Sequence, residues 1–413
     1  MVKKKVMIGL LSAAVLCTSA GIGYKQIFAN NVKKNVTLLS YSAAKVAKTD
    51  ATFKINALSC GEAVEWLSDN EVLTLNKKSE YSNPNIPGIK YPVYYLSVYN
   101  INTGKTKDFK DVNDAGDPIK ISPDKKYVLY TEPKVMPQVG NTEWQNDLNS
   151  GKLFSRSVKI LNLTNGKITD FKGEYKAKEA NYSWIDNNKL FVYYPNEGNK
   201  WNVENVDGTI YKTGNVKAPV AGSHPWPASN LNIKVSGNDV SGNFIVEVDD
   251  PSATGEDMKS TYYSVNVATN EMKQIYRTVG TAVGYTLENN VLLIDDWNKT
   301  DDFTRLVYFN DEGVKLGEAK TTEFNRNSAV GPVYDISKDG KTIAFPAIIP
   351  LPKGTPIKDV IKDTTTSLDI LDLSTGKMKK VYQSKNLIKD IRWSQDGTSL
   401  IFNDGKQYIL KIQ

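Results

Sequence analysis

The chain has very few residues of the kinds that carry metal binding and nucleophilic catalysis. Among its 413 residues there is one histidine, His224, and there are two cysteines, Cys17 and Cys60. Zinc sites need several cysteine or histidine ligands, and a Ser-His-Asp hydrolase would have to use His224, whose surroundings contain no Gly-x-Ser-x-Gly motif. We therefore expect no zinc, no cofactor and no serine-hydrolase site.

Disulfides and a strongly basic surface are also missing. Cys17 lies in an apolar N-terminal segment, so Cys60 is alone in the rest of the chain and cannot form an internal disulfide. The formal charge of +6 falls to about +2 without the four lysines of residues 3–25, and the other lysines are scattered among acids. Nucleic-acid binding is not expected.

The N-terminus has the pattern of an export signal. Three lysines at residues 3–5 precede an apolar run over residues 6–23. This run is also near the lower limit for crossing a bilayer, so a retained membrane anchor competes with a signal cleaved after Ala20 or Ala29. Either interpretation places the remainder outside the cytoplasm. We divide the chain into a signal peptide or anchor (1–29), a linker (30–50) and one domain (51–413).

Only five of the 52 basic residues are arginine, which is typical of an AT-rich genome. Together with the export signal, this predicts an exported protein of a low-GC Gram-positive bacterium, secreted, at the cell surface or membrane-anchored. Membrane contact is expected only through residues 6–23, if they are not cleaved.

The most abundant feature is a repeat. Seven times an apolar or aromatic residue is followed three positions later by Asp or Asn in a turn and then by a short apolar strand. The Asp or Asn of each repeat lies 55, 63, 51, 51, 50 and 57 residues after the one before it; these residues are Asp69, Asp124, Asn187, Asn238, Asn289, Asp339 and Asp396. Such a period indicates a propeller or solenoid. Trp66, Trp184 and Trp393 recur at the first position of the repeat, so we expect them in the structural core.

Each period also contains a second half that predicts a hairpin. Apolar and polar residues alternate before a turn residue that can adopt positive φ, namely Gly104, Gly166, Asn270 or Gly376. Four strands per period make one propeller blade. The last repeat lacks its fourth strand, and residues 52–56 can supply it. The predicted fold is therefore an all-β, seven-bladed propeller of four-stranded antiparallel blades, closed by an N-terminal strand and preceded by a hydrophobic helix.

The segments Ile121-Ser-Pro-Asp-Lys-Lys-Tyr-Val-Leu-Tyr130 and Ile336-Ser-Lys-Asp-Gly-Lys-Thr-Ile-Ala-Phe345 carry a family resemblance. The repeat resembles that of TolB-like and other WD-type propellers and of the propeller domains of prolyl oligopeptidases. The likeness spans about residues 51–413 and is degenerate in the fourth and fifth repeats. Residues 30–50 leave no room for the α/β domain of TolB, and no peptidase domain is expected, so the resemblance implies the fold alone.

A carbohydrate-active enzyme, either a glycosidase or a lyase, is the main catalytic alternative, because such propellers need only two or three carboxylates. The candidate pairs are Asp249 with Asp250, Asp295 with Asp296, and Asp301 with Asp302. Asp339 and Asp396 precede glycine directly, unlike sialidase Asp boxes, and are predicted to bond their own backbone in turns. The loop over residues 295–302 matches no calcium-binding EF-hand pattern. No metal site is predicted.

The strand order predicts one face with long, unlike loops. Connections between strands two and three of a blade, and between blades, leave on the same face, and all long insertions fall there: residues 77–92, 133–156, 213–230, 249–260, 295–304 and 346–365. Loops on a rigid scaffold are common recognition sites. The candidate binding residues are Tyr81, Trp144, His224, Trp226 and Trp297. The competing interpretation is that these rings fold back as lids over the blades.

We therefore predict a monomeric, extracytoplasmic, non-catalytic propeller that binds an envelope protein or a cell-wall polymer through this rim. The enzyme described above is one alternative. A membrane-anchored sensor ectodomain is the other, and it would require the N-terminal anchor to be retained.

Overall fold

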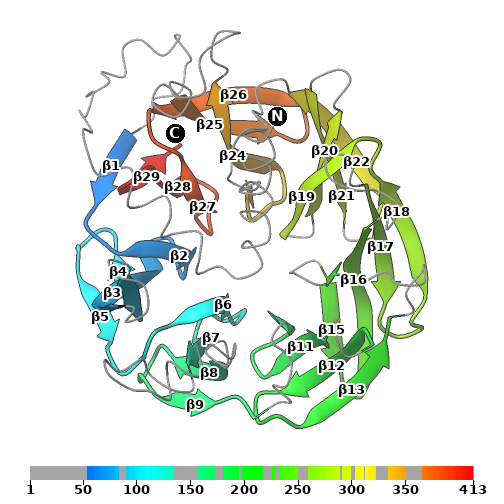
Figure 1. Cartoon of the computed structure of the whole chain (residues 1–413), viewed down its shortest axis with the longest axis horizontal. Coiled ribbons are helices and arrows are strands. Elements are labelled where there is room, and N and C mark those ends of the chain that lie inside the picture. Colours follow the sequence, from blue (N-terminus) through cyan, green and yellow to red (C-terminus); the bar gives the residue numbers. More distant parts are fainter. Residues whose placement is uncertain are drawn as a thin grey trace, which may run out of the picture.

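The strands of the chain form seven antiparallel sheets arranged as blades around a ring (Figure 1). This computed structural model describes residues 54–82, 90–133, 156–172, 180–194, 198–216, 226–227, 232–249, 259–288, 291–298, 303–310, 312–321, 334–349 and 365–412. The predicted seven-bladed all-β propeller is confirmed. The predicted signal or anchor and the linker lie outside the described residues, and within them no helix is long and apolar enough to span a bilayer.

The first three blades follow the sequence order of their strands. Blade 1 contains β2 (Glu62–Trp66), β3 (Glu71–Ser82), β4 (Lys90–Asn100) and β5 (Thr106–Phe109). Blade 2 contains β6 (Gly116–Ile121), β7 (Tyr127–Pro133), β8 (Arg156–Asn162) and β9 (Ile168–Asp170). Blade 3 contains β10 (Asn181–Trp184), β11 (Lys189–Tyr194), β12 (Lys200–Asn205) and β13 (Ile210–Asn215).

The fourth blade departs from this plan by one extra strand. In blade 4, β14 (Trp226–Pro227) and β15 (Asn232–Ser236) both pair with β16 (Asp239–Asp249), which is followed by β17 (Ser260–Asn266) and β18 (Met272–Arg277). Blade 5 contains β19 (Thr281–Glu288), β20 (Val291–Asn298), β21 (Phe303–Asn310) and β22 (Lys315–Thr321). Blade 6 contains β23 (Asp335–Ile336), β24 (Thr342–Ile349), β25 (Thr365–Asp372) and β26 (Lys377–Ser384).

Blade 7 combines the two ends of the described chain. Its strands are β27 (Lys389–Trp393), β28 (Ser399–Asn403), β29 (Gln407–Lys411) and β1 (Lys54–Leu58). β1 pairs antiparallel with β29, from Lys54 opposite Lys411 to Leu58 opposite Gln407. Compared with the predicted strand over residues 52–56, β1 is displaced by two residues, and Thr52 and Phe53 lie outside the described residues.

The apolar core lies between neighbouring blades. Alternate side chains of each strand point to opposite faces of its sheet, so both faces of a blade are buried against other blades. One cluster packs Leu73 and Leu96 of blade 1 against Val128 and Leu161 of blade 2. Equivalent clusters join the other neighbours, and one of them places Trp66 of blade 1 against strands β28 and β29 of blade 7.

Tryptophans of the innermost strands also bond to the preceding blade. The indole N–H of Trp66 donates to the carbonyl oxygen of Arg392 at 3.1 Å, across the junction of blades 1 and 7. In the same way Trp184 donates to Lys120 at 3.0 Å and Trp393 donates to Asp335 at 3.1 Å. Trp66 and Trp393 are buried and Trp184 is half-buried. The repeat position thus supplies both packing and a hydrogen bond.

The turns of one face are short and regular. The predicted hairpin residues adopt positive φ as expected, with values of 69° at Gly104, 77° at Gly166, 62° at Asn270 and 66° at Gly376. We call this the short-turn face, because the turns between strands one and two and between strands three and four emerge there. The opposite face is called the long-loop face.

Candidate functional site

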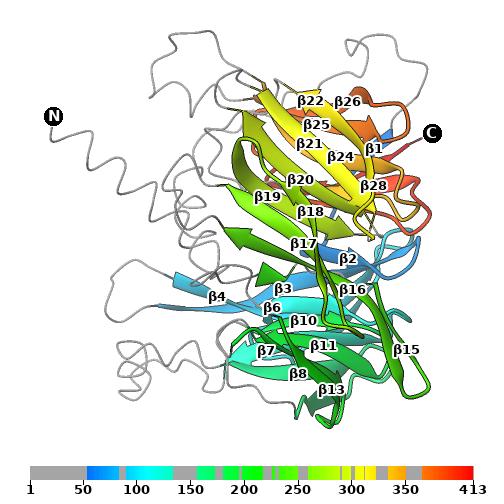
Figure 2. The same cartoon turned by 90° about the vertical axis from the view of Figure 1, so that its right-hand side faces the viewer.

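On the long-loop face, the described part of the chain contains a projecting β-ribbon. β2 pairs with β3 only from Val72 to Leu75, and β5 pairs with β4 only from Leu96 to Tyr99. The β3–β4 pairing nevertheless continues to Ser82 opposite Lys90. Figure 2 shows these two strands extending past the neighbouring blades. We call residues 76–82 and 90–95 the ribbon. Residues 77–92 were predicted to be a loop insertion. This prediction is wrong for residues 77–82 and 90–92, which lie in β3 and β4.

Charged side chains form contacts along the ribbon. Lys77 forms an ion pair with Glu80, and Lys90 on the opposite strand lies 3.7 Å from the same carboxylate. The hydrogen bond from Lys77 lowers the pKa of the exposed Glu80. Lys78 donates to the carbonyl oxygen of Lys110 at 2.8 Å, which connects the ribbon to the segment between blades 1 and 2.

An arginine network supports the base of the ribbon. Arg156 donates to Thr131 Oγ1 at 2.8 Å and lies 3.6 Å from the Asp114 carboxylate. Asp114, at a φ of 58°, accepts from the amide of Tyr94 in the ribbon at 3.3 Å. Burial raises the pKa of Asp114, and Arg156 opposes that shift. A Cβ on Gly116 would lie 2.6 Å from the guanidinium, so a side chain there would force Arg156 to move.

Buried carboxylates on this side accept hydrogen bonds from the connection that precedes their blade. Asp296, which is 2% exposed, accepts from the amides of Val279 and Gly280 at 3.0 and 2.8 Å and from the hydroxyl of Tyr276 at 2.5 Å. Glu132 accepts from the amide of Asn113 at 2.9 Å. These bonds fix the interblade connections, so Asp296 has a structural use.

Two of the other predicted carboxylates, Asp295 and Asp249, lie among the described residues. Asp295 is also 2% exposed and accepts from Tyr334, while Asp249 accepts from Ser260 at 3.0 Å. Burial raises the pKa of Tyr334, and the neighbouring Asp295 raises it further. The hydroxyl therefore stays protonated and donates to Asp295. Asp250, Asp301 and Asp302 lie outside the described residues. Within the described ranges, no three His, Cys, Asp or Glu side chains could hold a metal ion.

The predicted aromatic binding residues are only partly placed. Tyr81 belongs to β3, Trp226 to β14 and Trp297 to β20, while Trp144 and His224 lie outside the described residues. Trp226 pairs with Glu247 of β16, so its backbone is part of blade 4. The proposed role of these aromatic side chains stays a prediction.

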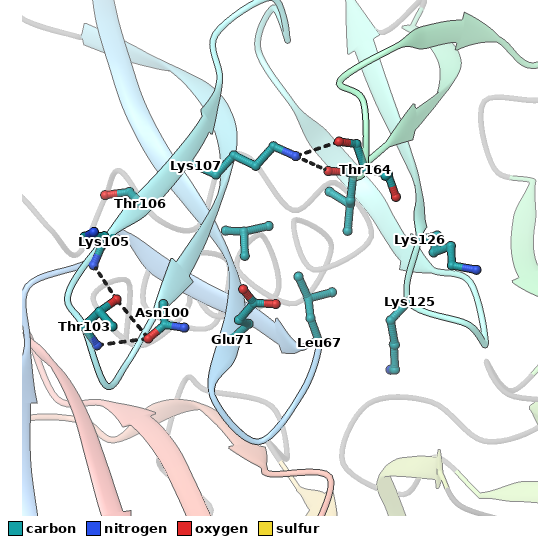
Figure 3. A pocket seen from close by; sticks show the side chains of 12 residues that line it. Leu67, Glu71, Asn100, Thr103, Lys105, Thr106, Lys107, Lys125, Lys126 and Thr164 are labelled. Carbon is teal, nitrogen blue, oxygen red and sulfur yellow. Dashed lines mark hydrogen bonds between the residues drawn. The ribbon is translucent and has the colours of Figure 1, made fainter.

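A cavity of about 500 Å³ lies on the short-turn face between blades 1 and 2. Its apolar lining comes from Leu67, Val98 and Leu163. Its charged lining consists of four lysines and one glutamate: Lys105, Lys107, Lys125, Lys126 and Glu71. Figure 3 shows Lys105 on the blade 1 side, Lys125 and Lys126 on the blade 2 side, and Glu71 between them.

Lys107 connects the two walls of this cavity. Its ammonium group donates to the carbonyl oxygens of Leu163 and Thr164 at 2.7 and 2.9 Å, as Figure 3 shows. Lys126 lies 3.5 Å from Asp124, so its charge is partly compensated. This cavity was not predictable from the sequence, because its lysines come from separate turns.

Comparisons with known proteins identify no family. No protein-family model and no curated protein sequence matches the chain. Among solved structures, an uncharacterized protein of Listeria monocytogenes EGD-e is 16% identical with a TM-score of 0.46, covering 85% of this chain and 92% of that one. The β-propeller domain of the Trilobed protease from Pyrococcus furiosus is 12% identical with a TM-score of 0.46, covering 86% and 94%. BamB from Moraxella catarrhalis is 12% identical with a TM-score of 0.40, covering 87% and 99%. At these identities the likeness concerns the fold alone.

Proposed function

We propose that this protein is an exported, non-catalytic propeller that binds an envelope protein or a cell-wall polymer through its long-loop face. The observation that supports this function is the ribbon. Outside the ring, its two strands have main-chain groups that no further described strand of blade 1 covers. Such strand edges are places where a partner strand or an extended polymer can add.

The base of the ribbon favours tight binding for a second reason. Ordering a flexible loop on binding costs conformational entropy, and a surface that is already ordered avoids this cost. Here Arg156, Asp114 and Lys78 fix the ribbon to the connection between blades 1 and 2. The partner would therefore meet a surface whose backbone is largely formed beforehand.

Export and closure belong to the same proposal. Residues 6–23 would form an apolar helix that directs the chain across the membrane and is then either cleaved or kept as an anchor. The mass of the mature N-terminus distinguishes these two outcomes. The pairing of β1 with β29 would close the ring, so that the binding face stays intact outside the cell.

Site-specific photo-crosslinking in intact cells tests the proposed face. A benzophenone amino acid replaces Ser79 in the ribbon, and a matched variant carries it at the exposed Thr269, on the short-turn face of blade 4. We expect crosslinks to a protein or to wall polymer from position 79 and none from position 269. Equal crosslinking from both positions, or none from position 79, would contradict the proposal.

A trimmed ribbon provides the complementary test. Residues 80–92 are replaced by Asn-Gly, which keeps the pair Ser79 and Val93 as the last register position. The trimmed protein should keep the Tm of the parent but lose cosedimentation with purified cell walls or capture of the crosslinked protein. Retained binding at an unchanged Tm would show that the ribbon is not the binding element.

A further inference from the structure

Three turns on the short-turn face are built alike. Each begins with a serine, continues with an aspartate two positions later, and leads into the second strand of blades 2, 6 and 7. The Ser–Asp side-chain bonds are Ser122 to Asp124 at 2.7 Å, Ser337 to Asp339 at 2.7 Å and Ser394 to Asp396 at 2.5 Å. In each turn the serine hydroxyl also accepts from the first strand amide at 2.9 Å. Because the three turns share these bonds, a residue that differs among them can be compared at one backbone position.

They differ at the residue that follows the aspartate. That residue adopts the left-handed conformation in all three, with φ of 61° at Lys125, 70° at Gly340 and 69° at Gly397. Glycine takes this conformation without a steric penalty, whereas a side chain there is strained. Blade 2 therefore keeps a lysine where its sister turns use glycine. The turn itself does not need that side chain.

Lys125 lines the cavity between blades 1 and 2. It is half-buried, and among the described residues its ammonium group has no hydrogen-bond partner. Burial lowers the pKa of Lys125, while Glu65 acts in the opposite sense and Lys338 of blade 6 lowers it further. A strained, partly desolvated cation that faces a cavity is a feature of binding sites.

The rest of the lining indicates the class of ligand. Lys105 and Lys126 add positive charge from opposite walls, and lysine is a common phosphate partner. Asn100 and Thr106 supply amide and hydroxyl groups, whereas the Thr103 hydroxyl already donates to Asn100 Oδ1. Glu71 can accept from hydroxyls. We propose that this interblade cavity binds a phosphate group carried on a sugar or polyol, with Lys125 as the phosphate-binding residue. The site lies on the face opposite the ribbon and does not depend on the function proposed above.

Calorimetric titration of the purified chain in phosphate-free buffer tests this site. The probes are glycerol 3-phosphate, inorganic phosphate, a glycerol-phosphate polymer and glucuronate. We expect saturable binding of glycerol 3-phosphate and weaker binding of inorganic phosphate, which lacks the hydroxylated skeleton. If the polymer binds more tightly than glycerol 3-phosphate, the phosphate group belongs to a polymer. If glycerol 3-phosphate binds more tightly than the polymer, the ligand is a small free ester. Binding of glucuronate alone, or of none of the probes, would overturn the assignment.

The variant Lys125→Gly separates binding from folding. Because glycine relieves the strained φ, the Tm should stay the same or rise, while the Kd for glycerol 3-phosphate should increase about tenfold or more through loss of a charge-assisted bond. The matched variant Gly397→Lys places lysine in a sister turn where a Cβ meets nothing within 4 Å. It should lower the Tm and leave the Kd unchanged. A lowered Tm in Lys125→Gly, or an unchanged Kd, would show that the lysine is structural.

Discussion

The junction between blades 1 and 7 makes the strongest prediction about stability. Trp66 donates to Arg392 across 326 residues of sequence, whereas Trp184 makes the same indole-to-carbonyl bond to Lys120 across 64 residues. Closing the longer loop costs about 1.4 kcal/mol more entropy, since this cost rises as (3/2)RT ln n. β1 is continuous in sequence with blade 1 and is held in blade 7 by its pairing with β29, so the ring is closed there by non-covalent contacts. The loss of one contact should therefore weaken this junction more than the junction of blades 2 and 3.

The substitution Trp66→Phe removes the hydrogen bond and part of a fully buried ring. The bond accounts for about 1 kcal/mol and the lost packing for about 1 to 2 kcal/mol, so we expect a loss of about 2 to 3 kcal/mol. With about 2.1 cal/mol/K of unfolding entropy per residue, a domain of about 360 residues should lose about 3 to 4 °C in Tm. Scanning calorimetry measures this change.

Amide hydrogen exchange distinguishes a local opening from a general loss of stability. In Trp66→Phe we expect faster exchange in β1 and β29, because the junction opens before the ring unfolds. In the matched Trp184→Phe variant these strands should exchange as in the parent. If Trp66→Phe leaves exchange in β1 unchanged, or if Trp184→Phe accelerates it equally, the junction of blades 1 and 7 is no weaker than the junction of blades 2 and 3. That result would refute the prediction.

Three further perturbations follow from the described contacts. Asp296→Ala removes the acceptor of two backbone amides and a tyrosine and should lower the free energy of unfolding by about 2 to 4 kcal/mol in urea titrations. Asp249→Ala, which removes the acceptor of the Ser260 hydroxyl, should have a smaller effect. The hydrogen bond from Ser337 lowers the pKa of Asp339, so the stability that it contributes is present above pH 4 and is lost as the pH falls through the lowered value; Asp339→Ala should weaken the protein at pH 7 and converge with the parent in acid. Burial raises the pKa of Cys60 to about 11, so alkylation of its thiol should be slow at pH 8 and accelerate up to about pH 11; a fast reaction at pH 7 would contradict this burial.

The repeat made the propeller predictable in detail. A period of 50 to 63 residues fixes the number of blades, and the turn chemistry fixes the position of each hairpin, because Gly or Asn must take the positive φ. Asp339 and Asp396 accept from the amides of Lys341 and Thr398 at 3.1 and 3.0 Å, as turn aspartates were expected to do. These features depend on residues that are close in sequence.

Features that depend on distant partners were not predictable in the same way. Residues 77–80 of the ribbon are all exposed, so this segment lacks the one-sided apolar alternation that identifies a packed strand. Asp295 and Asp296 resembled a catalytic pair in the sequence, but the groups that bond them include Tyr334 and the backbone of Val279 and Gly280. A sequence does not show which backbone amides will face a carboxylate.

The cavity could have been suspected from one residue. The same turn occurs several times in this chain, so the residue types at equivalent positions can be compared. The comparison shows which residues suit the backbone conformation of the turn and which do not. Glycine at Gly340 and Gly397 fits the left-handed turn, so Lys125 at the equivalent position is the local exception. A side chain in that conformation costs about 1 kcal/mol, which is a substantial fraction of the stability of a marginally stable fold. Exceptions of this kind concentrate at functional sites, which is why Lys125→Gly, more than a substitution of any exposed lysine, should separate binding from stability.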